Sequence, residues 1–242
     1  MFAFRKPAWW LIAVLLAAEI CFVAAAQWQW QRGVFKDQRA REFAAALRER
    51  DAAPRRNFNA LLASAADFSA ARLRGRLLLE HIVTLDNRIV QGQYGVDVFV
   101  PLALDGGGHV LVNLGWIAAD RSRRVAPQLP AIAPEFEASG LMAPAPSAGL
   151  SSQVPIERDS RTPQMLLAIV PHDIAAALQL SPMLGRVFLP AAESASPFHR
   201  DWQPSGMSAD RHRGYALQWA SFAVACLILF AIFHVRRKEK SR

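Results

Sequence analysis

Two long apolar runs, one near each end of the chain, constrain the fold of this sequence more than any other feature. Residues 9–26 form an 18-residue run with one charge, Glu19, and residues 215–235 form a 21-residue run without Asp, Glu, Lys or Arg. As helices these runs would rise about 27 Å and about 31 Å, enough to cross the hydrocarbon core of a bilayer. The pattern predicts two transmembrane helices.

The first run has two interpretations. Arg5 and Lys6 precede it and three alanines close it, an arrangement that also matches a signal peptide with its small-residue cleavage site. However, the run is longer than the ~7–15 residues usual for a signal core. We therefore favour a retained membrane anchor.

Basic residues lie outside both runs and predict an orientation. Arg5 and Lys6 come before the first run, and five basic residues follow the second: Arg236, Arg237, Lys238, Lys240 and Arg242. Positive charge marks the cytoplasmic ends of spans. We expect a cytoplasmic tail (1–8), a first span (9–26), a periplasmic β-rich domain (27–214), a second span (215–235) and a basic cytoplasmic tail (236–242).

Charge and cysteine content exclude several classes of function. Most of the net charge of +8 lies in the short tails, since residues 27–214 carry 21 Lys and Arg against 18 Asp and Glu. This balance argues against a nucleic-acid partner. The two cysteines, Cys21 and Cys226, both lie in apolar runs. The large domain therefore has no disulfide and no CxxC pair for copper or thiol-redox chemistry.

The region between the two runs predicts a β-rich domain, and the whole chain an α+β membrane protein. Charged residues 27–50 favour a helix, and apolar runs predict strands at 71–80, 82–87, 94–104, 109–119 and 185–191. Glycines predict turns at Gly92, Gly95 and 106–108, with a hairpin between Val100 and Val112. Residues 126–163 are expected to form a loop around one short strand at 136–143, and residues 171–180 a short helix.

The stretch HRGYALQW, at the entrance to the second run, holds the candidate site residues His212, Tyr215 and Trp219. A spacing of i, i+3 and i+7 places them on one helix face. Such residues suit a membrane interface without any ligand. A neutral imidazole there could also bind a metal, whereas His81, His109, His172 and His199 lack metal-ligand spacing.

Glu19 is an acid within the first apolar run. A buried carboxyl group in lipid is costly and usually faces a partner. We expect it either to contact Ser221 of the second span or to face another membrane protein.

Four segments together resemble the Surfeit locus protein 1 family. WQWQRGVFK resembles the family's WQxQRxxWK, with Phe35 in place of tryptophan. DNRIVQGQYGVDVFVPLAL and DGGGHVLVNLGW resemble its paired strands, NRxxxGxxGxxVxTPLxL and DGxxVLVNRGW, and DRHRGYALQW resembles HxxYAxxW. Leu114 stands where the family has arginine, which puts any contact of that arginine in doubt and could mark a divergent subgroup.

This resemblance implies an assembly factor, or chaperone, for haem-copper cytochrome c oxidase in the respiratory chain. Its partners would be oxidase subunit I and other assembly proteins, and it would bind haem a transiently and deliver it. His212 would then ligate the haem iron, with Trp219 lining the macrocycle and Tyr215 hydrogen-bonding a substituent or anchoring the helix. Since no Arg-rich presequence precedes Trp9, we expect a bacterial inner membrane.

Two alternatives differ in kind from haem delivery. One is a scaffold that holds oxidase subunits and binds no haem. The other is a membrane-anchored periplasmic hydrolase, which lacks support because the sequence has no GxSxG, HExxH or glycine-rich phosphate loop. We therefore expect no enzymatic activity.

Overall fold

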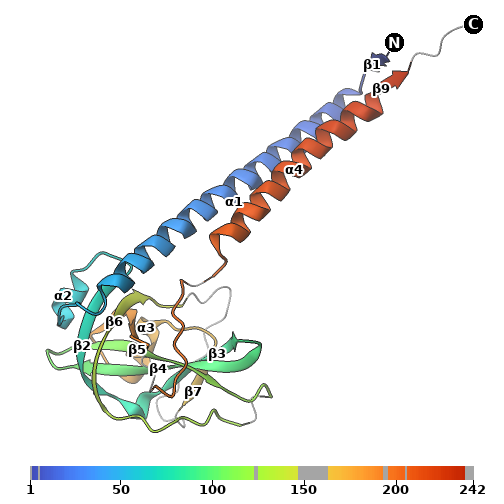
Figure 1. Ribbon diagram of the computed structural model, residues 1–242. Helices are drawn as coiled ribbons and strands as arrows, with labels where there is room; N and C mark the ends of the chain where they lie inside the picture. The colour runs from blue at the N-terminus through green and yellow to red at the C-terminus, as the bar shows by residue number, and fades with distance from the viewer. Residues whose placement is uncertain are drawn as a thin grey trace, which may run out of the picture. The chain divides into compact units, whose positions relative to one another are not determined.

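The computed structural model describes residues 2–4, 6–122, 125–146, 163–192, 196–204 and 206–237 (Figure 1). The chain divides into two compact units. Residues 1–41 and 206–242 form the first, here called the helix pair, and residues 42–205 form the second, here called the sheet domain. The architecture is the α+β fold expected, with a β-rich middle region between two long apolar helices.

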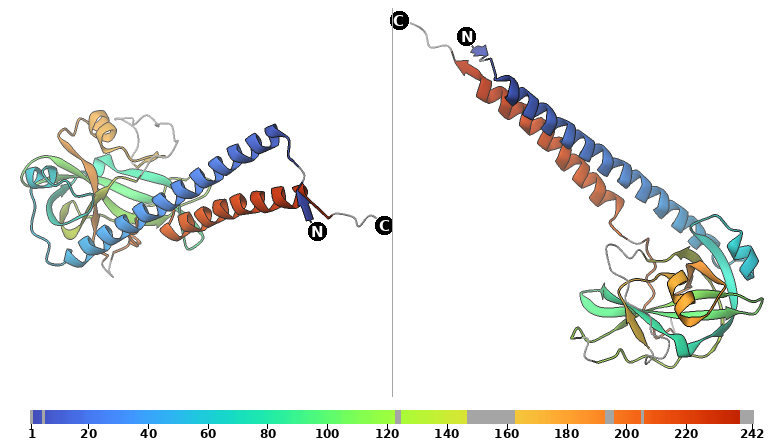
Figure 2. Two further views of the ribbon diagram at one scale, coloured as in Figure 1. Left: turned by 90° about the horizontal axis from the view of Figure 1, so that it is seen from above. Right: turned by 180° about the vertical axis from the view of Figure 1, so that it is seen from behind.

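The helix pair contains α4 (Ala209–His234) and residues 9–41 of α1 (Trp9–Glu49), and the two helices run antiparallel along each other (Figure 2). The last two turns of α1 belong to the sheet domain. Each contains an 18-residue segment of mean hydropathy 2.2, so both are long and apolar enough to cross a membrane. Large apolar side chains along both helices stay exposed, as lipid contact requires. Beyond the helices, β1 (Phe2–Phe4) pairs with β9 (Val235–Arg237).

Both helices extend past the limits of the apolar runs. α1 continues without a break through Ala26 to Glu49, so the charged segment predicted to be helical belongs to the same helix. α4 begins at Ala209, ahead of the predicted start of the span at Tyr215. His212 therefore lies in the first turn of α4. All of HRGYALQW is helical, so helical periodicity decides which of its side chains share a face.

The described part of the sheet domain holds a seven-stranded sheet with the order β2-β6-β8-β5-β4-β3-β7. Its strands are β2 (Ser69–Leu77), β3 (Val83–Val90), β4 (Gln93–Leu104), β5 (His109–Ala118), β6 (Glu135–Pro144), β7 (Gln164–Leu166) and β8 (Met183–Pro190). An additional pairing of β2 with β4 closes β2, β6, β8, β5 and β4 into a ring. The result is a small barrel with β3 and β7 extending from it.

Side chains alternate along each strand between the barrel interior and the solvent, as β2 illustrates. On β2 the arginines at 72, 74 and 76 are exposed, while Leu73 and Leu77 point inward. Gly75 lies where β2 turns from β6 to β4, and a Cβ there would fall 2.0 Å from the carbonyl oxygen of Ala103. Only glycine allows the two backbones to approach so closely.

The main core lies inside the barrel, and a second core lies on the outer face of the sheet. Phe188, Leu73 and Met142 are fully buried in the first, which also receives Leu61 from α2 (Phe58–Leu62). The second core lies beneath α3 (Pro171–Leu178). A one-turn 3-10 helix, η1 (Leu79–His81), joins β2 to β3.

Most predicted elements are confirmed. The four apolar runs between residues 71 and 119 form β2 to β5, and residues 100 and 112 pair directly in a hairpin. The short helix and the final strand correspond to α3 and β8. Gly92 does occupy a turn, with a φ of 79°.

The turn predicted at Gly95 was wrong. Gly95 lies inside β4, where close approach of the Ile117 carbonyl oxygen and the Trp116 indole leaves no room for a Cβ. The predicted short strand at 136–143 is confirmed as β6, which extends over Glu135–Pro144 and lies between β2 and β8. α2, η1 and β7 were not predicted, and residues 147–162 of the expected loop lie outside the described residues.

Candidate functional site

The candidate site lies within the helix pair, where the first turns of α4 contact α1. His212 is 7% exposed, and its neighbour along the helix face, Ala216, is 5% exposed. Trp219 continues this face and stacks on Phe22 of α1, with ring centroids 5.9 Å apart. The buried face of α4 is therefore polar at the helix start and aromatic two turns further along.

Gln29 of α1 is the hydrogen-bonding partner of His212. Its Oε1 lies 2.7 Å from Nδ1 of the imidazole. In the neutral imidazole, donation from Nδ1 to this amide oxygen leaves the lone pair on Nε2. The helices are in contact next to this pair, because a Cβ on Gly33, one turn along α1, would lie at van der Waals distance, 3.6 Å, from the His212 Cβ. The two helices thus meet at small residues around one polar pair.

Tyr215 does not share this buried face. Its side chain is 45% exposed, unlike those of His212 and Trp219. The prediction of one common face therefore holds for two of the three residues. Tyr215 lies on the flank of α4, because a three-residue step turns the helix about 60° away from His212.

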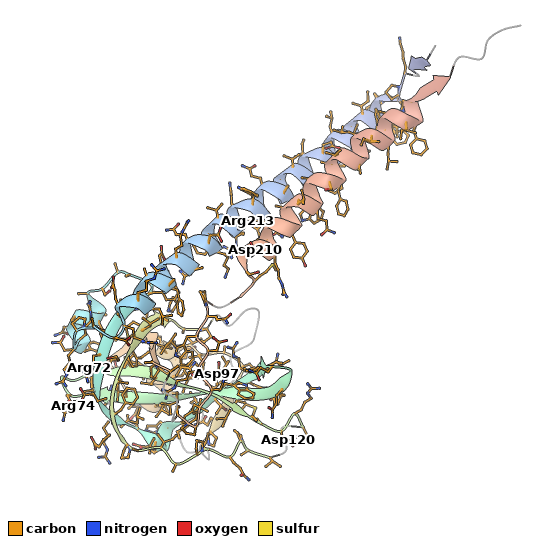
Figure 3. The ribbon with its side chains drawn as sticks, viewed as in Figure 1. Arg72, Arg74, Asp97, Asp120, Asp210 and Arg213 are labelled. Carbon is orange, nitrogen blue, oxygen red and sulfur yellow. The ribbon has the colours of Figure 1, made fainter. Side chains whose placement is uncertain are left out.

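Charged residues surround the start of α4. Arg213 is bonded to Asp37 of α1 and to Asp210, the latter at 3.2 Å (Figure 3). On α1, the guanidinium groups of Arg32 and Arg39 lie 5.5 Å and 5.7 Å from the Phe35 ring centroid. Phe35 thus offers an aromatic face to two cations, a role that a tryptophan could also fill.

The predicted contact between Glu19 and Ser221 is not formed. The Ser221 hydroxyl donates to the Leu217 carbonyl at 2.8 Å, within its own helix. This local bond is available to any serine in an apolar helix and needs no partner from α1. One carboxyl oxygen of Glu19 is buried without a hydrogen-bond partner. The alternative, that Glu19 faces another membrane protein, stays a prediction.

Three other histidines contact residues outside this site. His109 contacts the Pro182 carbonyl at 3.3 Å, and His199 meets the Trp116 ring edge-on. His234, at the opposite end of α4, contacts the Phe230 carbonyl at 2.8 Å. Among the described residues no three His, Cys, Asp or Glu side chains gather as a metal ion would require.

The two strand motifs form β3, β4 and β5 of the sheet and include an ion pair whose carboxylate is buried. Asp97 on β4 is 5% exposed and lies 2.7 Å from Nε of Arg88 on β3. Burial raises the pKa of Asp97, and the nearby guanidinium offsets only part of this effect. The Trp116 indole donates to the Arg88 carbonyl at 3.1 Å and covers Gly95. These residues join three strands.

Leu114, at the position of the family's arginine, belongs to the barrel core. It is 3% exposed and lies where the pairing of β4 with β5 shifts register. Its carbonyl accepts a hydrogen bond from Arg200 Nε at 2.7 Å. An inward-facing arginine here would leave a charge in an apolar core, so leucine suits this environment.

Sequence reasoning missed Gln29, Asp37 and Arg213. Gln29 stood inside the motif WQWQRGVFK, but nothing local distinguished it from Gln31. Only the packing of α1 against α4, far apart in the sequence, reveals that Gln29 meets His212.

Comparison with protein families agrees with the motifs. A sequence model described as the SURF1 family matches residues 16–224, which include most of both long helices and the whole sheet domain. A comparison with curated proteins gives no match.

Proposed function

The chain belongs to the SURF1 family of cytochrome oxidase assembly factors, and from this premise we propose that it delivers haem a to oxidase subunit I. Haem a would be its cargo, which the protein would bind transiently and then pass to the oxidase subunit. The proposal rests mainly on the contact between Gln29 and His212, which joins the family's first and last motifs at one point.

His212 is the residue we assign to the haem iron. Its Nδ1 is engaged by Gln29, so Nε2 is the nitrogen left with a lone pair. A partner on the second ring nitrogen fixes tautomer and orientation and raises the basicity of a ligating imidazole. Gln29 is therefore a positioning residue. Because His212 is only 7% exposed, iron would reach Nε2 only as α1 and α4 part locally.

Trp219 and Phe22 supply the apolar surroundings that a porphyrin needs. Their stacked rings lie about two turns from His212 along α4. A flat aromatic cargo could replace this stacking with stacking on its own macrocycle. Tyr215, already exposed, would hydrogen-bond a substituent or anchor the helix at the membrane surface.

The second candidate function is a scaffold for oxidase subunits that binds no haem. The contact between Gln29 and His212 is also compatible with a scaffold, because a buried histidine bonded to glutamine can serve simply to hold two helices together. A periplasmic hydrolase stays a third and weaker alternative. Three measurements on the purified protein separate these functions. Haem absorbance favours delivery, a bound oxidase subunit without haem favours a scaffold, and turnover of a generic ester favours a hydrolase.

The experiment starts from full-length protein purified out of haem-a-producing cells. We expect a Soret band that His212→Ala weakens or shifts, that Gln29→Leu shifts, and that Trp219→Leu affects less. His234→Ala is the matched control, since His234 is the other α4 histidine and its Nδ1 contacts a backbone carbonyl of its own helix. Unchanged spectrum, haem content and oxidase yield in His212→Ala would reject the ligand assignment in favour of the scaffold.

We also propose that the protein resides in a bacterial inner membrane with both termini cytoplasmic and the sheet domain periplasmic. The basic residues before α1 and after α4 support this orientation. Alkaline phosphatase fused after Arg124 should be active and fused after Arg242 inactive. A mature chain beginning at Gln27 would instead indicate a cleaved signal.

Deletion of the gene should lower cytochrome c oxidase activity while other respiratory steps continue. The expected loss is partial, because an assembly factor raises the yield of the enzyme and performs none of its chemistry. Normal oxidase activity and haem content under all growth conditions would contradict the proposal.

A further inference from the structure

A groove on the sheet domain is lined by three arginines and shares no residue with the candidate haem site. It encloses about 270 Å³ between the segment before α2, strand β2 and the turn that joins β4 to β5. Its lining residues are Arg55, Arg56, Asn57, Arg74, Leu104, Asp105 and Gly106.

The fold gathers these arginines from two neighbouring segments. The backbone around Arg55 runs beside β2, with Arg72 N donating to the Pro54 carbonyl at 3.0 Å and Arg56 N donating to the Arg72 carbonyl at 3.2 Å. Strand alternation then sets Arg72 and Arg74 on the same outer side of β2 (Figure 3). The groove is therefore a product of strand pairing.

Carboxylates on neighbouring elements pair with most of this charge. Glu137 of β6 lies 2.8 Å from Arg55 and 3.3 Å from Arg72, and Asp105 lies 3.3 Å from Arg74. The hydrogen bond from Arg55 lowers the pKa of Glu137. Each guanidinium carries five N–H donors, so one carboxylate contact leaves Arg55 and Arg74 with donors to spare.

Arg56 differs from its neighbours. It makes no ion pair within the described part of the chain, and its Nε is buried there without a hydrogen-bond acceptor. Burial lowers the pKa of Arg186, the Asp67 carboxylate raises it, and the Arg56 guanidinium lowers it, so Arg56 lies near both a second cation and a carboxylate. Arg186 itself donates to the carbonyls of Leu61 and Ala66. Arg56 is therefore the groove arginine whose charge has no paired carboxylate among the described residues.

We propose that this groove binds a phosphate group, carried by an anionic lipid or present as free phosphate. A phosphate offers several oxygens, so it can accept from the terminal N–H groups of Arg56 and from spare N–H groups of Arg55 and Arg74 together. Asp105 lies on the wall of the groove, and a bound phosphate would compete with it for Arg74.

The test uses full-length protein in detergent micelles and follows thermal unfolding. One series compares inorganic phosphate with sodium chloride at matched ionic strength, and another compares phosphatidylglycerol with uncharged, phosphate-free diacylglycerol. We expect at least one phosphate compound to raise Tm more than the phosphate-free compound in its series. A response to phosphate alone identifies free phosphate, and a response to phosphatidylglycerol alone identifies a lipid headgroup.

Variants assign the response to the groove. Arg56→Gln should weaken binding about tenfold or more, since it removes a charge-assisted hydrogen bond. Arg76→Gln is the matched control, because Arg76 is on the same strand but outside the groove and pairs with Glu135 at 3.4 Å. If Arg56→Gln does not fold, Arg56→Lys and Arg74→Gln take its place. Equal binding by groove variants and parent, or equal Tm with phosphate compounds and with the phosphate-free ones, would overturn the proposal.

Discussion

Removal of the Arg88 side chain tests how the buried carboxylate of Asp97 is tolerated. Arg88→Met keeps the aliphatic length and the backbone carbonyl that receives the Trp116 indole, but removes the guanidinium. The side chain of Asp97 is only 7% exposed, whereas that of Arg88 is 52% exposed. The variant therefore leaves an uncompensated charge on the buried side of the pair.

The loss of folding free energy in Arg88→Met has an upper limit. Removing one partner of a buried ion pair costs about 3–5 kcal/mol. A buried carboxylate can avoid part of this cost by taking a proton. From an unfolded pKa of about 3.9, that costs at most roughly 4 kcal/mol at pH 7. Because Arg88 is half exposed, its removal also lets water approach, and we expect a destabilisation of about 2–3 kcal/mol.

The pH dependence follows from the direction of the pKa shift. Burial raises the pKa of Asp97, and loss of Arg88 raises it further. The folded state then holds the proton more tightly than the unfolded state. Stability is therefore greatest below the unfolded pKa and falls as pH rises through the folded pKa. Arg88→Met should be close to the parent near pH 4 and clearly weaker at pH 7.

Urea denaturation of the full-length protein in detergent, followed by tryptophan fluorescence, measures these differences. Asp97→Asn should restore most of the stability lost in Arg88→Met at pH 7, since it removes the buried charge. Arg76→Met is the control, because its exposed pair with Glu135 contributes about 0–1 kcal/mol. Equal losses in Arg88→Met and Arg76→Met, or a loss that does not shrink at low pH, would refute the reasoning.

Three further predictions concern tight or unusual positions. Gly95→Ala should destabilise the sheet domain by about 3 kcal/mol in urea denaturation, because the new Cβ would lie 2.4 Å from Trp116 indole atoms. Gly185→Ala is the control and should be neutral, since Gly185 has open space around it. Leu114→Arg restores the family's residue type but buries a charge in the barrel core, so we expect little folded protein on size-exclusion chromatography; a stable variant would mean that the side chain can turn outward. Glu19→Leu removes a carboxyl group with a buried, unpartnered oxygen, so its Tm in detergent should stay equal or rise, and a lower Tm would reveal a partner.

Part of the candidate site could be predicted from local pattern. The i, i+7 spacing correctly placed His212 and Trp219 on one face, because helical periodicity depends only on residues within a few turns. The same pattern could not tell that Tyr215 would be exposed, since the direction of the α1 contact decides which flank is covered.

The long-range contacts of the site required the tertiary structure. Gln29 and His212 are separated by 183 positions, and their contact exists because α1 continues past the apolar run and α4 starts before it. A helix was predicted over residues 27–50, but neither its continuity with the first span nor the start of α4 at Ala209 follows from the apolar runs. The arginine groove likewise depends on the segment before α2 pairing with β2.

By itself the sequence determined the two apolar helices, the alternating strands and the hairpin from residue 100 to residue 112, because hydropathy, side-chain alternation and turn glycines are local properties. Alternation does not specify which edges pair. Only the tertiary structure decided that β8 enters between β5 and β6 and that β2 meets β4 to close the barrel. That closure depends on Gly75, where the absence of a side chain lets two strands cross in contact.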